Sequence, residues 1–170
     1  PDMKAKLIEF YDDEQLMSLD NLFFKGDYFV IRDEGKVVCG AQAIPEEWQI
    51  RSMPGLSGKI MLHVFPRIPY MNRLFRKDLR FILIEGIYYE PGYEEWLEPL
   101  FKSILHHYGL HLAICCLDNQ SKAYGVIKNL DQGILRRFTQ EIPMDVMVKG
   151  IGGATTENSK PVYISGFDIL

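Results

Sequence analysis

Residues 81–117 read FILIEGIYYEPGYEEWLEPLFKSILHHYGLHLAICCL, and this stretch decides the fold. It opens with an unbroken apolar run, Phe81-Ile82-Leu83-Ile84, which continues into residues 85–89. A short apolar run of this kind is typical of a strand that is buried on both faces. Glu90-Pro91-Gly92 then interrupts the run. The sequence therefore predicts a buried strand that ends in a tight turn.

A helix and a second strand are predicted after this turn. Apolar residues recur at helical spacing from Tyr93 to Tyr108, and Gly109 is placed to end the helix. The segment from Leu110 to Leu117 is again apolar and predicts a strand. Two parallel strands need a crossover of about this length, and such crossovers are nearly always right-handed. We therefore expect a strand–turn–helix–strand unit with a parallel strand pair.

The composition is that of an ordinary globular protein, with 170 residues, 47% hydrophobic and 25% charged. We expect a single domain over residues 1–170 and, because no leader or membrane-spanning run is visible, a cytoplasmic location. The net charge of −4 gives no support to nucleic-acid binding. The chain begins with Pro1 rather than Met, from which we expect a piece of a longer polypeptide.

No metal site is predicted, because neither the three cysteines nor the four histidines show zinc-ligand spacing. Cys115 and Cys116 are adjacent in a predicted strand, so their side chains point to opposite faces and do not suit a disulfide. Reduced thiols are expected. His106 and His107 stand where basic residues interact favourably with a helix C-terminus.

Four segments follow from the pattern along the whole chain: a helical lead-in (1–24), a β-hairpin (25–45), an insertion (46–79) and a core with C-terminal strands (80–170). The hairpin is predicted from Tyr28–Arg32 and Lys36–Ile44, joined by a turn that contains Gly35. Pro45 is expected to end its second strand.

Shorter elements are predicted in the insertion and after Leu117. The insertion is expected to hold short helices at Lys59–Phe65 and Tyr70–Phe75. A helix at Asn119–Leu130 is expected to start at Asp118 or Asn119. Further strands are predicted at residues 133–139, 144–149 and 162–167.

This order of elements, from Tyr28 to Leu170, resembles the GNAT acyl-CoA N-acyltransferase superfamily. It also resembles the C-terminal domain of longer bacterial proteins with tandem GNAT-like domains, so a preceding N-terminal domain is an expected partner. The resemblance implies an α+β fold with a mixed, mainly antiparallel sheet flanked by helices. In that superfamily the strand before the turn carries a bulge and splays from its parallel neighbour. The pantetheine arm enters this cleft, and pyrophosphate binds backbone N–H groups at the next helix N-terminus.

The resemblance also implies roles for individual residues. Glu85 would be the general base that takes a proton from an attacking amine, and Tyr124 the general acid for the departing thiolate. The amides of Gly92 and Tyr93 would hold the donor phosphates, with Asn119 near the pantetheine arm. The implied function is acyl transfer from acyl-CoA, as co-substrate, to a small-molecule amine, without a metal.

The turn departs from the superfamily's pattern of Arg or Gln, two residues, Gly, one residue, then Gly or Ala. Here it reads Tyr89-Glu90-Pro91-Gly92-Tyr93-Glu94, and of these only Gly92 matches. Five Glu and no Lys or Arg lie between Glu85 and Glu98. Two like charges about 4 Å apart repel by roughly 4 kcal/mol at an effective dielectric of about 20, so pyrophosphate binding is opposed. The alternative function is a degenerate GNAT-like domain that binds no donor and serves as an interaction or substrate-recognition module.

Three structural alternatives remain open. Glu85 and Gly86 together fit a strand bulge from which Glu85 points to solvent. Tyr124 fits a packed helix residue, and the superfamily's usual spacing from Asn to Tyr places Lys128 nearer that position. The basic residues between Arg67 and Arg80 fit a solvated face, or a surface that binds an acidic partner, anionic lipid or coenzyme A phosphates.

Overall fold

The computed structural model describes residues 3–19, 22–23, 27–52, 55–69, 72, 77–131, 133 and 160–165. The chain forms two compact units. We call Leu19–Cys116 with Ser165–Leu170 the sheet unit, and Pro1–Ser18 with Leu117–Ile164 the bridge unit.

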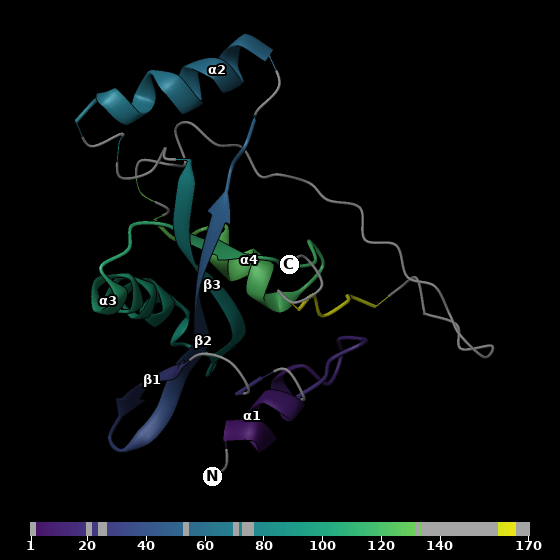
Figure 1. Ribbon diagram of the computed structural model, residues 1–170. Helices are drawn as coiled ribbons and strands as arrows, with labels where there is room; N and C mark the ends of the chain where they lie inside the picture. The colour runs from purple at the N-terminus through teal and green to yellow at the C-terminus, as the bar shows by residue number, and fades with distance from the viewer. Residues whose placement is uncertain are drawn as a thin grey trace, which may run out of the picture. The chain divides into compact units, whose positions relative to one another are not determined.

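The sheet unit contains a four-stranded mixed sheet in the order β1-β2-β3-β4 (Figure 1). Its strands are β1 Asp27–Asp33, β2 Lys36–Gln49, β3 Asp78–Tyr89 and β4 Ala113–Cys115. The first three strands pair antiparallel, and β3 pairs with β4 in parallel. The predicted fold class, α+β with a mainly antiparallel mixed sheet, is therefore confirmed.

The parallel pair lies where the sequence predicts it. Ile82, Leu83 and Ile84 of β3 stand opposite Ala113, Ile114 and Cys115 of β4, respectively. The apolar run is buried as expected, since Phe81 and Ile82 are fully shielded from solvent. The second strand is shorter than the predicted segment from Leu110 to Leu117.

The crossover between β3 and β4 consists of the short 3-10 helix η3 Glu94–Trp96 and the helix α3 Leu97–Tyr108. Leu97, Leu100 and Ile104 form its buried stripe, and α3 contacts β1 and β2. The helix thus follows the predicted periodicity, although its first turn is 3-10 rather than α.

Gly109 ends α3 as predicted. It has a left-handed backbone with φ of 62°, and its N–H donates to the carbonyl of His106 at 3.1 Å. The N–H of Leu110 donates to the carbonyl of Leu105 at 3.0 Å. These two bonds satisfy carbonyls at the helix end in the Schellman arrangement.

The hairpin is confirmed, but the prediction that Pro45 ends its second strand is wrong. β2 continues to Gln49, and Pro45 stands opposite Ile82 of β3. The reason is its place in the sheet. β1 reaches only as far as Ala43, so from Ile44 onward β2 has a neighbour on one side among the described strands. A proline is tolerated on such an edge because no ladder hydrogen bond is lost there.

The insertion contains the helix α2 Gly55–His63 and the 3-10 helix η1 Phe65–Arg67. The predicted helix at Lys59–Phe65 is therefore present but starts earlier in the chain. In Figure 1, α2 lies beyond the ends of β2 and β3. The other predicted helix, Tyr70–Phe75, lies outside the described residues apart from Asn72.

The predicted helical lead-in over residues 1–24, most of which belongs to the bridge unit, is found only in part. α1 spans Met3–Phe10, and residues 11–19 are not helical. Leu16 has a φ of 62°, which a right-handed helix does not allow. Gln15 instead forms a parallel bridge with Val162. The N–H of Gln15 donates to the carbonyl of Pro161 at 2.8 Å, and the N–H of Tyr163 donates to the carbonyl of Gln15 at 2.9 Å.

The remaining predicted elements lie after Leu117. α4 is Lys122–Ile127, and its N-cap is Ser121, whose hydroxyl accepts the N–H of Tyr124 at 3.2 Å. The expected cap Asp118 instead accepts the N–H of Gln120 at 2.8 Å. Of the strand predicted at 162–167, residue 162 forms the bridge and 163–165 are not strand. Residues 166–167 and the predicted strands 133–139 and 144–149 lie outside the description, apart from residue 133.

Candidate active site

A β-bulge interrupts β3 at the position that the sequence singles out. Gly40 stands opposite Tyr88 and Gln42 opposite Glu85, so two residues of β3, Gly86 and Ile87, face the single residue between Gly40 and Gln42 on β2. Gly86 has a φ of 54°, a left-handed conformation that glycine adopts without steric cost. The predicted bulge is therefore present, and β3 continues beyond it to Tyr89.

The pairing of β3 with β4 ends directly before this bulge. Ile84 and Cys115 are the last paired residues. In the described part of the chain, β4 therefore pairs with no residue of β3 beyond Ile84. The bulge and the end of the parallel ladder meet at Glu85.

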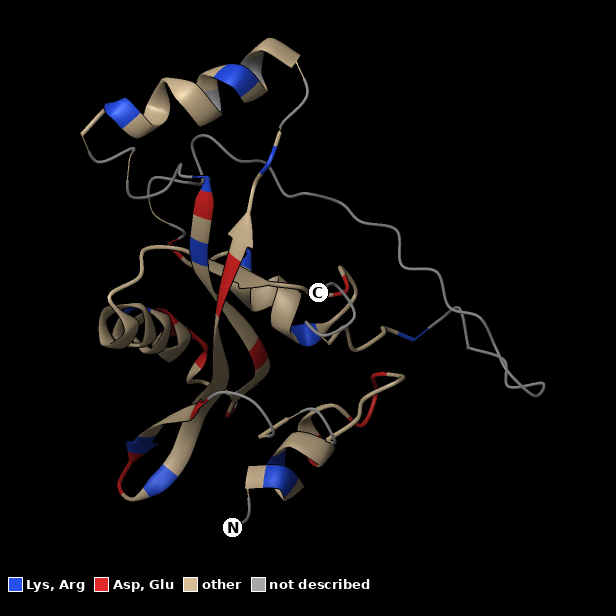
Figure 2. Ribbon diagram, in the orientation of Figure 1, with Lys and Arg blue, Asp and Glu red and all other residues tan. Residues whose placement is uncertain are grey.

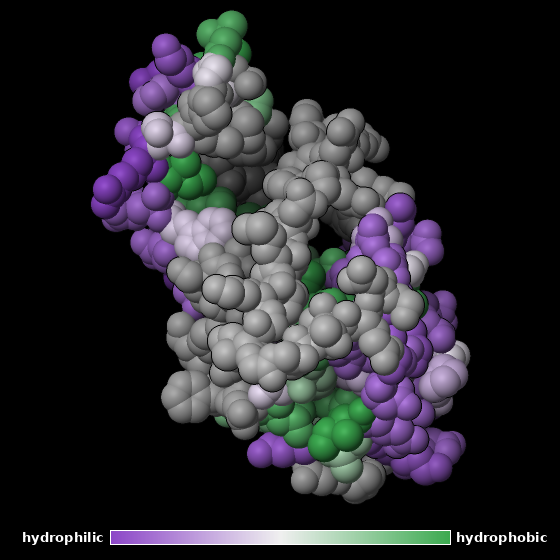
Figure 3. Space-filling view, turned by 90° about the vertical axis from the view of Figure 1, so that its right-hand side faces the viewer, coloured by the Kyte–Doolittle hydropathy of each residue, from purple (hydrophilic) through white to green (hydrophobic). Residues whose placement is uncertain are grey.

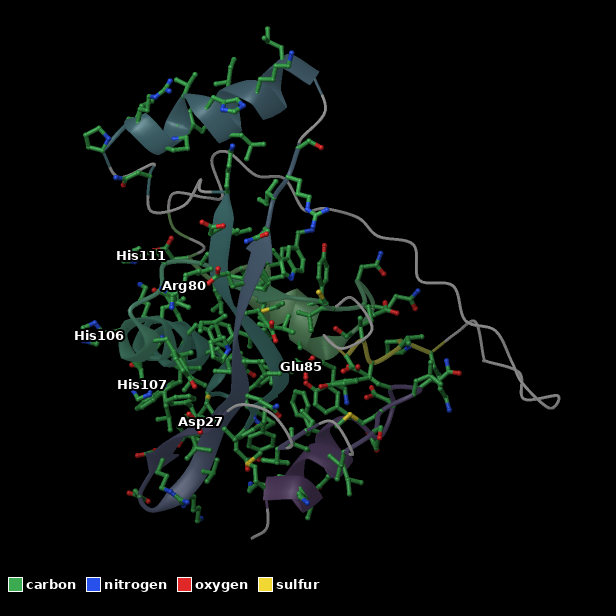
Figure 4. The ribbon with its side chains drawn as sticks, in the orientation of Figure 1. Asp27, Arg80, Glu85, His106, His107 and His111 are labelled. Atoms are coloured by element: carbon green, nitrogen blue, oxygen red, sulfur yellow. The ribbon has the colours of Figure 1, made fainter. Side chains whose placement is uncertain are left out.

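Glu85 is buried, with 5% of its surface exposed, so the alternative in which it points to solvent is wrong. It stands across from Gln42, which is fully buried and accepts the backbone N–H of Phe23 at 2.9 Å. Figure 4 shows Glu85 among the side chains around β3. A carboxyl and an amide thus occupy neighbouring positions on one face of the sheet.

Cys116 lies close enough to Glu85 to sense its charge. Burial raises the pKa of the Cys116 thiol, and the negative charge of Glu85 raises it further. The neighbouring Cys115 has its pKa raised to about 12, mainly by burial. Both residues are free thiols. A raised thiol pKa keeps the group protonated and poorly nucleophilic.

The bulge is held by a tyrosine from β1. The hydroxyl of Tyr28 donates to the carbonyl of Gly86 at 2.8 Å, and the ring of Tyr28 lies against that of Phe23 with centroids 5.0 Å apart. A Cβ atom at Gly40 would come within 2.7 Å of the Tyr28 ring. Glycine at position 40 therefore lets Tyr28 cross β2 and reach β3.

The turn after β3 already uses the two backbone amides that the resemblance assigns to donor phosphates. The N–H of Gly92 donates to the Oε1 atom of Glu94 at 3.1 Å, and the N–H of Tyr93 donates to the carbonyl of Glu90 at 3.0 Å. Gly92 has a φ of 90°, and nothing lies within 4 Å of where its Cβ would stand. The turn thus supplies its own acceptors, one of them an anion.

Tyr93 connects this turn to the hairpin. Its hydroxyl donates to the Oδ2 atom of Asp33 at 2.7 Å, and its carbonyl accepts the thiol of Cys39 at 3.2 Å. The hydrogen bond to Asp33 raises the pKa of Tyr93, and burial together with the charge of Glu94 raises that of Cys39 to about 11. The surroundings of Tyr93 are therefore acidic, which disfavours a bound anion.

Asn119 and Tyr124 belong to the bridge unit, whereas Glu85, Gly92 and Tyr93 belong to the sheet unit. Asn119 is exposed in the turn before α4. The Tyr124 hydroxyl accepts a hydrogen bond of 3.2 Å from the ammonium of Lys128, which also lies 5.3 Å from the centre of the Tyr124 ring. Lys128, the residue nearer the superfamily's Tyr position, is thus a direct neighbour of Tyr124.

Sequence reasoning missed two polar residues beside Glu85, namely Tyr28 and Gln42. Gln42 carried a usable signal, because it is a polar residue within the otherwise apolar run from Val37 to Ile44. A polar side chain at the centre of a buried strand generally needs a partner. Tyr28 carried no such signal, since its bond to Gly86 depends on position 40 being a glycine.

Metal ligands and membrane spans were searched among the described residues. They contain no group of three or more His, Cys, Asp or Glu placed to hold a metal ion, and none of their helices has the length and apolar character to cross a bilayer. Figure 4 shows His106 and His107 at α3, away from Glu85, and the His107 ring lies 5.2 Å from that of Phe29.

Comparison with known proteins gives one structural likeness. No protein-family model matches the chain, and no curated protein matches it. A solved structure of a predicted acetyltransferase with acetyl-CoA from Clostridium acetobutylicum is similar with a TM-score of 0.44 and 13% sequence identity, covering 88% of this chain and 92% of that one. The fold class and the geometry of the site described above do not rest on this likeness.

Proposed function

We propose that the sheet unit carries the catalytic carboxylate of an N-acyltransferase, which transfers an acyl group from an acyl-CoA-type thioester to an amine. The supporting observation is the position of Glu85. It is buried at a bulge, where the parallel ladder between β3 and β4 ends. In the superfamily that the sequence resembles, the strand before the turn carries a bulge and parts from its parallel neighbour, and the pantetheine arm enters there. A buried carboxylate at this position suits the role of general base.

In the proposed reaction Glu85 acts as the general base. The amine nitrogen attacks the thioester carbonyl, a C–N bond forms, the C–S bond breaks, and the nitrogen's proton passes to Glu85 directly or through one water. The departing thiolate takes up a proton. The assignments of Tyr124 as the proton donor and of Asn119 as a pantetheine contact remain predictions of the superfamily resemblance.

The turn favours a second candidate function, a GNAT-like domain without donor binding that serves as an interaction or substrate-recognition module. The amides of Gly92 and Tyr93 are engaged by Glu94 and Glu90. A donor pyrophosphate at this place would have to displace the Glu94 carboxylate and then lie beside it, at a cost of several kcal/mol. The two candidates therefore differ in whether coenzyme A binds at all.

Titration calorimetry with acetyl-CoA and with a longer-chain acyl-CoA separates the candidates. The acyltransferase candidate predicts measurable heat at protein concentrations of about 100 μM. Absence of heat with both ligands would exclude coenzyme A chemistry and leave the module. The variant Glu94→Gln sharpens the test, because it removes the competing charge and retains an oxygen that accepts the Gly92 amide. It is expected to bind either ligand more tightly than the unmodified chain does.

If a donor binds, Glu85→Gln tests the base. Turnover with a panel of primary amines is measured by the release of free thiol. It is expected to fall by about 100-fold or more in this variant, while donor affinity is unchanged. Glu47→Gln is the matched control, because Glu47 is an exposed carboxylate on β2 that lies 3.7 Å from the side chain of Arg80. Unchanged turnover in Glu85→Gln would exclude the proposed base.

A further inference from the structure

The insertion carries an exposed face that the proposed acyl transfer does not use. Leu56, Ile60, Val64 and Ile68 are spaced four residues apart and are 75%, 38%, 45% and 42% exposed. They lie on α2 and on the residues that continue it through η1. Large apolar side chains at this exposure, gathered on one helix face, mark an interaction surface.

The helical backbone is continuous along this face. The N–H of Val64 donates to the carbonyl of Ile60 at 2.9 Å, and that of Arg67 donates to the carbonyl of Val64 at 3.0 Å. The N–H of Ile68 donates to the carbonyl of Phe65 at 3.0 Å. Leu56, Ile60 and Val64 therefore lie on one side, whereas Ile68 follows the 3-10 turn of η1 in an extended conformation and adds an exposed apolar side chain at the end of the face. Gly58 and Leu62, on the opposite side of the helix, are buried.

Basic residues interleave with the aliphatic ones. Lys59, His63 and Arg67, also four apart, are all exposed. Figure 2 shows basic and no acidic residues along α2 and η1, and the upper end of the view in Figure 3 shows hydrophobic beside hydrophilic residues. Residues 50–77 contain six Lys or Arg, and all 23 Asp and Glu of the chain lie outside that segment. The face is thus apolar and cationic within an acidic protein.

We propose that the α2–η1 face docks on an anionic membrane surface. The aliphatic side chains would enter the boundary between headgroups and acyl chains, while Lys59 and Arg67 extend to the lipid phosphates. α2, with nine residues, is too short to span a bilayer and suits a position in the interface plane. The charge of the segment is complementary to anionic headgroups.

An acidic protein partner fits this face less well. The cores of protein interfaces are enriched in aromatic residues, Met and Arg and depleted in Lys. The exposed residues of α2 instead combine aliphatic side chains with Lys59. Long basic side chains beside aliphatic ones are favoured at lipid interfaces, where the methylene stem is buried and the charge reaches the headgroups. An acidic protein partner is kept as the competing outcome of the experiment.

Flotation of the full chain with vesicles tests the proposal. One set of vesicles is phosphatidylcholine alone, and the other contains about 30% phosphatidylglycerol. The chain is expected to float with the anionic set, and the bound fraction should fall as salt rises. Each basic residue at such a surface contributes about a fivefold change in the binding constant. Lys59→Glu/Arg67→Glu should therefore weaken binding by about 25-fold or more.

The apolar contribution is tested with Leu56→Ser/Ile60→Ser, which should weaken binding by about tenfold or more. The matched controls are Arg32→Glu/Lys36→Glu on the exposed hairpin and Ile8→Ser on α1, and both should bind like the unmodified chain. Thermal melts of every variant verify folding.

Equal binding to both vesicle sets, or an equal loss of binding in the hairpin variant, would overturn the proposal. Binding to polyglutamate without binding to vesicles would overturn it in favour of an acidic protein partner.

Discussion

The hydroxyl of Tyr28 on β1 bonds to the carbonyl of Gly86 on β3 at 2.8 Å, although β2 lies between the two strands. The ring passes over Gly40, where any side chain would collide with it. The bulge next to Glu85 is therefore fixed from two strands away. The backbone around the proposed base thus depends on a side chain from β1.

Removal of this hydroxyl should destabilise the sheet unit. Tyr28→Phe is expected to lower the free energy of unfolding by about 0.5–1.5 kcal/mol, because the Gly86 carbonyl loses its bond from the tyrosine. Urea denaturation provides the measurement. Tyr108→Phe is the control, since its hydroxyl bonds to Asp27 at 3.0 Å in an exposed position and should cost less. An equal loss in both variants would contradict the role given to Tyr28.

Alanine at two glycines separates backbone strain from packing. Gly86 and Gly92 both have positive φ, but a Cβ at Gly86 would come within 2.8 Å of the Leu22 side chain, whereas nothing lies within 4 Å at Gly92. We expect Gly92→Ala to cost about 1–2 kcal/mol from strain and Gly86→Ala about 2–4 kcal/mol. Chemical denaturation of both variants measures the difference. In a Leu22→Ala background the extra cost at Gly86 should shrink.

Thiol alkylation reports on Glu85 without any assay of activity. Because the charge of Glu85 raises the pKa of Cys116, Glu85→Gln should lower that pKa and speed alkylation of Cys116 at pH 8 by roughly two- to fivefold. Cys39 is the internal control, because its thiol is fully buried and bonded to the Tyr93 carbonyl, so its slow alkylation should not change. Peptide mass spectrometry distinguishes the two sites. Acceleration at Cys39, or an unchanged rate at Cys116, would contradict the geometry.

Glu14 should make the bridge unit sensitive to pH. Burial, followed by the charges of Asp13 and Asp118, raises its pKa from 4.5 to about 7, and Lys122 opposes this shift. Since the folded-state pKa exceeds the unfolded value, the stabilising contribution is complete below about pH 4.5 and is lost as the pH rises through about 7.

Glu14→Gln should remove this dependence and stabilise the bridge unit at pH 8 by about 1–3 kcal/mol. Hydrogen exchange of the amides of Gln15 and Tyr163, which form the parallel bridge, provides the measurement between pH 5 and 8, after correction for intrinsic exchange rates. Glu9→Gln on α1 is the control. Protection that rises with pH in the unmodified chain would contradict the assignment.

The sequence predicts the β3–α3–β4 unit well because its signals are local. An unbroken apolar run, a helical stripe and Gly109 each constrain the backbone within a few residues. The bridge between Gln15 and Val162 has no local signal, because its partners are far apart in the chain. Local propensity therefore predicts a helix around Gln15, whereas in the structure Gln15 pairs with Val162 instead.

The position of the bulge beside Glu85 was predictable from the sequence, but the detail around it was not. The pair Glu85-Gly86 marks the bulge, and the acidic character of the turn is visible in the sequence. That Glu94 accepts the Gly92 amide is a matter of side-chain geometry, which spacing does not specify. The continuation of β2 past Pro45 likewise depends on where β1 ends.

The last six residues of β2, from Ile44 to Gln49, form an edge among the described strands. An open edge invites a strand of another molecule to add to the sheet, which is a common start of aggregation. Pro45 has no N–H to donate to an added strand, and the charges of Glu46 and Glu47 repel a second copy of the same edge. A proline that breaks the expected pattern of a strand thus protects the protein against sheet-to-sheet self-association.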